Sequence, residues 1–279
     1  MTTLNSIEKP KIICLGEALV DRLGLPGRTI SNASQYEDFL GGAPANVASA
    51  LARLRVSVAF VGRLGNDQIG EKFCKMMKNR GVNLKALQID NCRPSRIVLV
   101  KRDKDGDRSF HDFHGNEGKG FADQFLELSL LKKTWPLISA DSKWLVIGTI
   151  PLAKSTSSES LLWAVNNAVS NGIRIALDVN WRPTFWDTNL LPSSGPNELA
   201  LKLILPLLNK ANLLKLAKEE ALWFFDTDNP LEISKSLTQM PDVVITNGQY
   251  SVKWIVNGIS GESPTFSSIS VVDTTGAGD

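Results

Sequence analysis

The sequence has few of the residues that mark secreted, disulfide-stabilised or membrane proteins. Its three cysteines, Cys14, Cys74 and Cys92, are odd in number and form no CxxC pair, which indicates free, mostly buried thiols in a reducing compartment. Residues Met1–Lys11 are polar and lack the apolar core of a secretion signal. No stretch has eighteen uninterrupted apolar residues, so no membrane span is expected. These absences predict a cytoplasmic protein that does not contact membranes.

Excess charge and metal-binding histidines are scarce as well. The chain has 31 basic and 29 acidic residues, a net charge of +2, and no dense run of lysine or arginine. Nucleic acid is therefore not an expected partner, and a small soluble molecule is favoured. The two histidines, His111 and His114, lie three residues apart in an expected strand. Side chains at that spacing on a strand point to opposite faces, which argues against a metal-binding pair.

What the chain does have is a regular alternation of short apolar runs and amphipathic stretches. With 279 residues, 43% of them hydrophobic, it can bury a sizeable core. The apolar runs predict strands at Lys11–Gly16, Ser57–Gly62, Lys143–Gly148, Ile173–Asp178, Asn212–Leu216 and Asp242–Thr246. Helices are expected at Pro44–Arg53, Gln68–Asn79, Asp123–Lys132, Thr156–Asn171 and Leu199–Asn209, with Gly81 and Gly172 ending two of them. This order predicts a doubly wound α/β sheet, covered by helices on both faces, that binds ligands beyond the carboxyl ends of its strands.

Two segments interrupt the alternation, residues 17–40 and about 93–118. In the second, Ser95–Lys101 and Arg108–Phe113 flank the polar turn Asp103–Asp107, which predicts a β-hairpin. Strands inserted into an α/β core are expected to project over the ligand cleft as a small lid. We find no internal repeat or interdomain linker, so residues 1–279 are expected to form one domain with this lid.

The end of the chain, Asp273-Thr274-Thr275-Gly276-Ala277-Gly278-Asp279, has the residues that phosphoryl transfer requires. Glycines let the backbone approach a phosphate and direct N–H groups at it. A carboxylate beside such an anion site can orient a substrate hydroxyl and accept its proton. An ordinary glycine-containing turn has the same composition, so the surrounding motifs must decide between the two interpretations.

Two further motifs accompany this ending. Gly41-Gly42-Ala43-Pro44-Ala45-Asn46 opens a helix, and Gly16-Glu17-Ala18-Leu19-Val20-Asp21 leaves the first expected strand with an acid at its end. Together with Val61–Gly70 and the closing heptapeptide, these stretches resemble the PfkB-type (ribokinase/fructokinase-like) carbohydrate kinases over nearly the whole chain. The resemblance implies a ribokinase-like three-layer α/β/α fold with a β-sheet lid, ATP as phosphoryl donor, Mg²⁺ as the metal and a sugar hydroxyl as acceptor.

The resemblance also implies roles for individual residues. Asp279 matches the catalytic base, and Gly276, Ala277 and Gly278 match the anion hole. Asp21, Gly42 and Asn46 match the positions that hold the sugar hydroxyls, for which a carboxylate and an amide offer suitable acceptors and donors.

Three stretches between these motifs are also similar to family segments. Asp178-Val179-Asn180-Trp181-Arg182 resembles a segment whose polar side chains face the phosphates or the sugar, although an Asp–Arg pair supporting a loop would look the same. Glu220 matches a glutamate that helps organise magnesium, but Ala217 replaces the usual polar residue three positions earlier, and a surface glutamate at a helix start is the alternative. Thr246 and Gly248 match a nucleotide-binding turn, in which Ser251 stands for the next glycine.

The match is closest to fructokinases, because Gly-Gly-Ala-Pro-Ala-Asn is less basic than the ribokinase counterpart. His114 stands near a position where many fructokinases have arginine, so a 2-keto-3-deoxygluconate kinase, another sugar kinase or a kinase-like binding protein are the alternatives. Asp273 and Thr275 match a monovalent-cation loop of some relatives. Dimerisation through the lid is a further expectation. In the family a helix follows the Gly-Ala-Gly-Asp turn, so little activity is expected of residues 1–279 alone.

Overall fold

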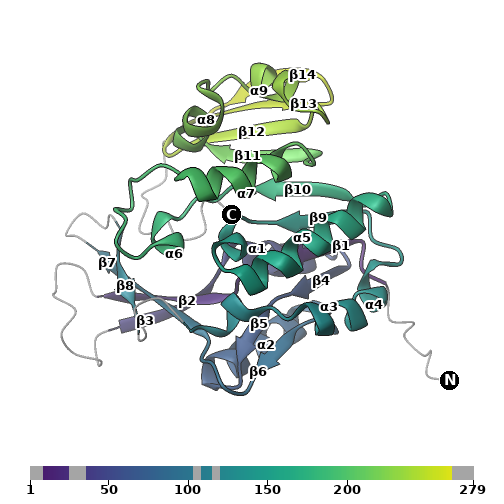
Figure 1. Ribbon diagram of the computed structural model, residues 1–279, viewed down its shortest axis with the longest axis vertical. Helices are drawn as coiled ribbons and strands as arrows, with labels where there is room; N and C mark the ends of the chain where they lie inside the picture. Colours follow the sequence, from purple (N-terminus) through teal and green to yellow (C-terminus); the bar gives the residue numbers. More distant parts are fainter. Residues whose placement is uncertain (1–8, 25–35, 103–107, 115–119, 266–279) are drawn as a thin grey trace.

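The structure is a computed structural model that describes residues 9–24, 36–102, 108–114 and 120–265. An eight-stranded sheet forms its centre, in the order β14-β13-β12-β11-β10-β9-β1-β4 (Figure 1). The strands from β12 to β4 are parallel, and β13 and β14 add an antiparallel hairpin at one edge. The strands of this sheet are β1 (Ile12–Leu15), β4 (Val58–Val61), β9 (Trp144–Ile147), β10 (Arg174–Asp178), β11 (Leu213–Ala217), β12 (Asp242–Asn247), β13 (Tyr250–Val256) and β14 (Ile259–Ser263).

The central strands are buried on both faces, which explains why they are almost continuously apolar. In β1, Ile13 and Leu15 pack into one hydrophobic cluster, whereas Cys14 between them packs into the other. Successive side chains of a strand point to opposite faces, so β1, β4 and β9 contribute to both cores. One core contains residues of α5 and α7, and the other contains residues of α1 and α2. The predicted doubly wound fold, with helices on both faces of a mostly parallel sheet, is confirmed.

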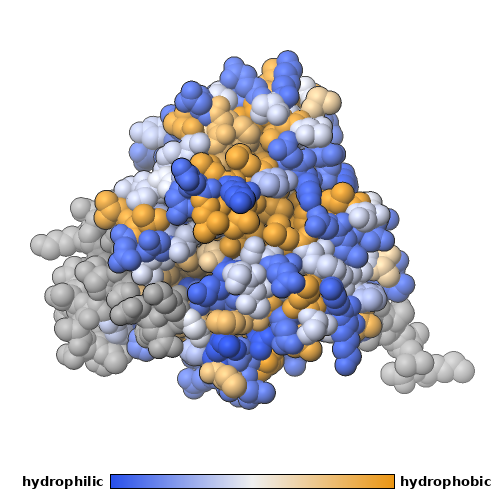
Figure 2. Space-filling model, in the orientation of Figure 1, coloured by the Kyte–Doolittle hydropathy of each residue, from blue (hydrophilic) through white to orange (hydrophobic). Residues whose placement is uncertain are grey.

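Four of the predicted helices are present within a residue or two of their expected bounds, namely α1 (Ala43–Arg53), α2 (Gln68–Arg80), α5 (Ser155–Ser170) and α7 (Glu198–Leu208). Local side chains fix their ends. The Gly70 N–H donates to Asp67 Oδ1 at the start of α2, and Gly81 ends that helix with a left-handed φ of 85°. Figure 2 shows apolar side chains gathered over α7, where Leu199 and Leu205 are exposed.

The prediction of one helix over Asp123–Lys132 is wrong, because the helical backbone is interrupted in the middle of this range. A 3₁₀ turn, η2 (Ala122–Phe125), is followed by α3 (Leu128–Thr134), with extended backbone at Leu126 and Glu127 between them. Gln88 stabilises this interruption. Its side chain donates to the Glu127 carbonyl and accepts from the Glu127 N–H, at 2.8 Å each. These are backbone groups that a continuous helix would have used itself.

The remaining helical segments are short, and apart from the helix start at Glu220 the sequence did not predict them. They are α4 (Pro136–Ser139), α6 (Pro183–Trp186), α8 (Lys218–Phe225), α9 (Pro230–Ser236) and the 3₁₀ turn η3 (Ile150–Ala153). No helix among the described residues is both long and apolar enough to cross a lipid bilayer.

A second, four-stranded sheet has the order β3-β2-β7-β8 and lies to one side of the main sheet (Figure 1). It consists of β2 (Leu19–Gly24), β3 (Tyr36–Gly41), β7 (Arg96–Arg102) and β8 (Arg108–Phe113). Strands β7 and β8 pair antiparallel, as the hairpin prediction requires. A third pair, β5 (Arg63–Gly65) with β6 (Gln88–Asp90), connects this sheet to the region of α2.

The three cysteines are free, but the expectation that they are mostly buried is wrong. Cys14 is buried in β1, Cys74 is half-buried on α2, and Cys92 is exposed in the turn after β6. Burial raises the pKa of the Cys14 thiol far above its usual range. Cys14 therefore acts as a small apolar side chain of the core.

Candidate functional site

The candidate site follows the carboxyl-terminal edge of the parallel strands, where most of the predicted residues lie. Three groups occur along this edge: the turn after β1 with the entry to α1, the loop after β10, and the ends of β11 and β12. Strands β9, β10 and β11 separate β1 from β12 in the sheet. Four inter-strand spacings of ~4.8 Å place the outer groups roughly 19 Å apart. The edge is therefore long enough for two ligands side by side.

The first group brings Asp21, Gly42 and Asn46 together. Gly42 caps α1 with a left-handed φ of 95°, and the Asn46 N–H donates to its carbonyl at 2.9 Å. Asp21 lies beside this turn, because a Cβ at Gly41 would be 2.8 Å from Asp21 Oδ2. Glu17, buried at the end of β1, fixes the turn by accepting from the Ala43 N–H at 3.2 Å.

Gly42 is required here for two reasons. A left-handed φ is costly for other residues, and a Cβ at this position would be 2.6 Å from the Glu17 carbonyl oxygen. The resemblance to the PfkB family implies a binding role for Gly42. The structure adds that it allows the close packing of the β1 turn against the start of α1.

The second group is the loop after β10, which contains Asn180 and Arg182. Asn180 has a left-handed φ of 42°, and the Thr149 hydroxyl donates to the Val179 carbonyl at 2.5 Å. The Arg182 guanidinium donates to the Trp181 carbonyl at 2.9 Å. The predicted alternative of an Asp178–Arg182 pair is not seen, since Asp178 is paired with Lys215 at 3.1 Å. Lys215 is a part of this group that the sequence analysis did not single out.

Glu220 joins the second and third groups. It is buried in the first turn of α8, and its two carboxylate oxygens accept from the Trp181 N–H at 2.6 Å and the Ala217 N–H at 2.7 Å. Burial raises the pKa of the Glu220 carboxyl above its usual value, and the nearby Asp178 raises it further, against the opposing effect of the two N–H groups. The alternative of a surface glutamate is wrong. Both oxygens are used within the protein, so any effect on a metal would be indirect.

The third group lies at the end of β12. Thr246 pairs with Ala217 across the sheet, and its hydroxyl donates to the Leu216 carbonyl at 3.4 Å. Gly248 follows with a left-handed φ of 52°, and nothing lies within 4 Å of a Cβ built there. Ser251 is in β13 and has no positive φ, so the absence of a glycine at this position causes no backbone strain.

A buried ion pair near the first group was missed by the sequence analysis. Arg96, 2% exposed, donates to Asp123 at 2.9 Å. Its guanidinium carbon lies 5.2, 4.9 and 4.7 Å from the ring centres of Phe113, Phe121 and Phe185. Within the described residues, Arg96 Nη1 and Asp123 Oδ1 are buried without a hydrogen bond. Together with Glu17 they line a small enclosed cavity. An arginine in an apolar strand normally indicates a solvent-facing position, so the sequence carries no signal for this pair.

Gly276, Ala277, Gly278 and Asp279, together with Asp273 and Thr275, lie outside the described residues. No group of three or more histidine, cysteine, aspartate or glutamate side chains in the described ranges could hold a metal ion.

The fold and this edge define an α/β protein with a two-part ligand site and a second sheet beside it. The sequence model of the pfkB family carbohydrate kinases matches residues 9–279. The chain belongs to this family of sugar kinases.

The individual relatives include fructokinases. The chain is 28% identical over 274 residues to the probable fructokinase-5 of Arabidopsis thaliana, covering 97% of this chain and 80% of the relative. The apo fructokinase of Vibrio cholerae O395 is 28% identical with a TM-score of 0.74, and the match covers 97% of this chain and 86% of that one. A structure of the Vibrio cholerae fructokinase in a fructose-, ADP- and calcium-bound form has 26% identity and a TM-score of 0.76, covering 97% and 80% of the two chains.

Proposed function

We propose that this protein transfers the γ-phosphoryl group of ATP to a hydroxyl of fructose, giving fructose 6-phosphate. The observation that carries the proposal is the family match over residues 9–279, together with relatives named fructokinase. The fructose- and ADP-bound structure of the Vibrio cholerae relative supports both the acceptor and the donor. The grouping of Asp21, Gly42 and Asn46 at the entry to α1 supports a sugar site at that end of the edge.

In the proposed mechanism, the Asp21 carboxylate and the Asn46 amide bind sugar hydroxyls and fix the acceptor in one orientation. Arg182 adds a positive charge from the loop after β10. Asp279 accepts the proton of the attacking hydroxyl, and the backbone N–H groups of Gly276, Ala277 and Gly278 stabilise charge on the transferred phosphoryl group. The second sheet acts as a lid that excludes water from this group, so that transfer to water is suppressed.

The nucleotide is proposed to bind at the other end of the edge, against Thr246, Gly248 and Asn180. The roughly 19 Å between the outer groups suits an extended triphosphate that reaches from this end toward the sugar. A divalent cation, Mg²⁺ with ATP, would neutralise phosphate charge. The described residues fit an ion held mainly by phosphates and water, because Mg²⁺ takes few direct carboxylates. Asp178 and Glu220 would supply negative charge near it without direct ligation, since both oxygens of Glu220 accept backbone N–H groups.

A coupled assay of ADP release over a panel of sugars tests the function. The panel contains fructose, glucose, ribose and 2-keto-3-deoxygluconate, and Asp279→Asn is the control variant. We expect the highest kcat/KM with fructose and at least a hundredfold loss of kcat in the variant, in line with the removal of a general base. A higher kcat/KM for another sugar would transfer the proposal to that sugar.

Ligand binding is measured beside turnover, so that the proposed acceptor site is tested independently of catalysis. Thermal unfolding with and without fructose and ADP–Mg²⁺ reports binding through the rise in the midpoint. Fructose binding that is weakened by Asp21→Asn supports the proposed acceptor site even where turnover is slow. If the protein shows neither ligand binding nor sugar-stimulated ADP release, the kinase proposal is contradicted and a kinase-like binding protein is favoured.

A further inference from the structure

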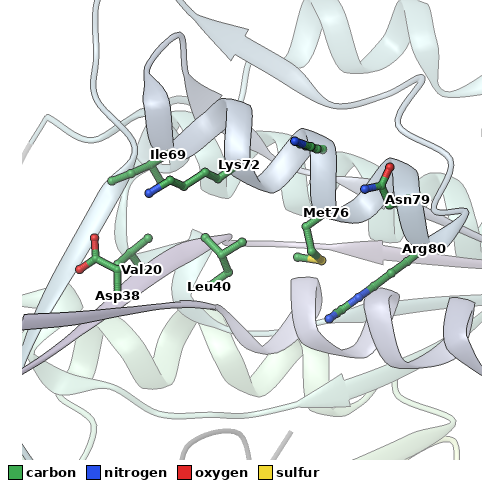
Figure 3. A pocket seen from close by; sticks show the side chains of 9 residues that line it. Val20, Asp38, Leu40, Ile69, Lys72, Met76, Asn79 and Arg80 are labelled. Atoms are coloured by element: carbon green, nitrogen blue, oxygen red, sulfur yellow. The ribbon is translucent and has the colours of Figure 1, made fainter.

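A groove on the far side of the second sheet has the composition of a second ligand site. It has a volume of about 540 Å³ and lies between α2 and the strands β2 and β3 (Figure 3). We call it the α2 groove. Its lining residues are Val20, Asp38, Leu40, Ile69, Lys72, Lys75, Met76, Asn79 and Arg80. This volume is within the range of small-molecule sites, about 300–1,000 Å³.

The α2 groove has an apolar floor and a cationic rim. Val20 and Leu40 of the second sheet and Ile69 and Met76 of α2 form the apolar floor. Figure 3 shows the Lys72 side chain extending toward Asp38 at one end of the groove and the Arg80 guanidinium beyond Met76 at the other. On that helix, Lys72, Lys75 and Arg80 are exposed. The first and last of these are eight residues apart, so the positive charge extends over roughly 12 Å of helix.

Among the described residues, this charge is only partly balanced. Asp38 is the one carboxylate among the lining residues, and it is held by the Arg22 guanidinium through two hydrogen bonds of 2.7 and 2.8 Å. The hydrogen bond from Arg22 lowers the pKa of Asp38, and the charge of Lys72 lowers it further. In the described part of the chain, Lys72, Lys75 and Arg80 form no ion pair.

We propose that the α2 groove binds an organic phosphate of nucleotide size, with its flat apolar body on the floor and its phosphates on the cationic rim. The apolar floor distinguishes this ligand from inorganic phosphate or a bare sugar phosphate, which would leave it exposed to water. A nucleic-acid strand is disfavoured, because the cationic rim is short and the chain has no dense run of lysine or arginine to follow a longer phosphate backbone.

The α2 groove is separate from the candidate phosphoryl-transfer site. Val20 faces the groove, whereas its neighbour Asp21 projects from the opposite face of β2, beside Gly41. A bound nucleotide would therefore contact the strand that carries the candidate sugar-binding carboxylate. The proposal does not depend on which sugar is phosphorylated.

Photolabelling of the full chain with 8-azido-ADP, followed by peptide mapping, tests the proposal. We expect labelled peptides from residues 36–40 or 68–80, in addition to those of the candidate nucleotide site. Labelling in those two ranges should fall at least fivefold in the double variant Lys72→Glu/Lys75→Glu. The matched control is Lys133→Glu/Lys235→Glu, which makes the same charge change at exposed lysines of α3 and α9 and should label like the unmodified chain.

Competition identifies the ligand class. Unlabelled ADP should protect the groove peptides, whereas inorganic phosphate at the same concentration should not. Absence of label in residues 36–40 and 68–80, equal labelling in the charge-reversed variant, or equal protection by phosphate would each overturn the proposal. Labelling in the groove is independent of turnover, so failure of the kinase proposal would appear only in the ADP-release assay.

Discussion

At the scale of single residues, Glu220 shows how a buried charge can organise a site without touching a ligand. Its oxygens hold the Trp181 N–H of one loop and the Ala217 N–H at the start of α8. Trp181 lies between Asn180 and Arg182 in the loop after β10. We infer that Glu220 positions this loop, and that the candidate binding residues Asn180 and Arg182 depend on it indirectly.

Replacing Glu220 by glutamine should destabilise the protein by about 1–3 kcal/mol, because the amide NH₂ would face a backbone N–H and leave that buried donor unsatisfied. Urea denaturation measures the change in the free energy of unfolding. Glu219→Gln, at the exposed neighbouring position, is the control and should stay within about 0.5 kcal/mol of the original chain. Equal stability of the two variants would contradict the positioning role.

Glu220 also makes the free energy of unfolding depend on pH. The folded pKa of Glu220 is raised above its ordinary value of 4.5. Its contribution to stability is therefore fully present below the unfolded pKa and is lost as the pH rises through the folded pKa. The amount by which Glu220→Gln is less stable than the original chain should therefore shrink as the pH rises above 4.5, which urea denaturation at a series of pH values measures.

Gly42 offers a second residue-scale prediction with an internal control. Gly42→Ala should lose more stability than Gly258→Ala, since both have a left-handed φ but only Gly42 would place its Cβ against backbone, 2.6 Å from the Glu17 carbonyl oxygen. The φ penalty alone is about 1–2 kcal/mol and applies to both. Thermal unfolding compares the two variants, and fructose binding should weaken only in Gly42→Ala. Equal losses would show that the turn can relax.

At the scale of secondary-structure elements, the Arg96–Asp123 pair connects β7 of the second sheet to η2. Leucine at either position alone should cost about 3–5 kcal/mol, because the remaining charge would stay buried without a partner. The double variant Arg96→Leu/Asp123→Leu should lose much less than the sum, since it buries no charge at all. A double-mutant cycle of unfolding free energies measures this coupling. Additive losses would contradict a direct interaction.

The same elements show what the sequence could and could not predict. Strands β1 and β9 and helices α1 and α5 follow from their apolar periodicity, because local pattern and burial agree. The helix expected at Asp123–Lys132 failed because Gln88, far away in the chain, binds the backbone of Glu127. Contacts of this kind depend on the fold and leave no local pattern.

The candidate site was likewise predictable only in part. Asp21, Gly42 and Asn46 could be proposed from the resemblance to the PfkB family, and the structure places them near one another at the entry to α1. Arg96 was not found, because its environment is assembled from three phenylalanines on β8, α6 and the segment before η2. The roles of Glu220 and Lys215 likewise became visible only when the ends of β10 and β11 were placed side by side.

At the scale of the whole molecule, the second sheet lies beside the main sheet and has exposed edges and an exposed apolar side chain. Its outer strands are β3 and β8, so their hydrogen-bonding edges have no neighbour within the described sheet. Exposed strand edges and apolar side chains favour association with another chain. Phe39 on β3 is 40% exposed and lies opposite Asp21 across the sheet, on the face that the lid proposal turns toward the sugar.

We therefore predict a homodimer formed through the second sheet, with a mass of twice the 30.5 kDa of one chain. Phe39→Asp should shift the protein to the monomer, because a carboxylate would have to be desolvated in the interface. Leu137→Asp is the matched control: this residue is also exposed, at 54%, but lies on α4, away from the second sheet. Size-exclusion chromatography with light scattering gives the mass of each. A monomeric original chain would contradict the prediction, and a control that dissociates equally would move the interface to α4.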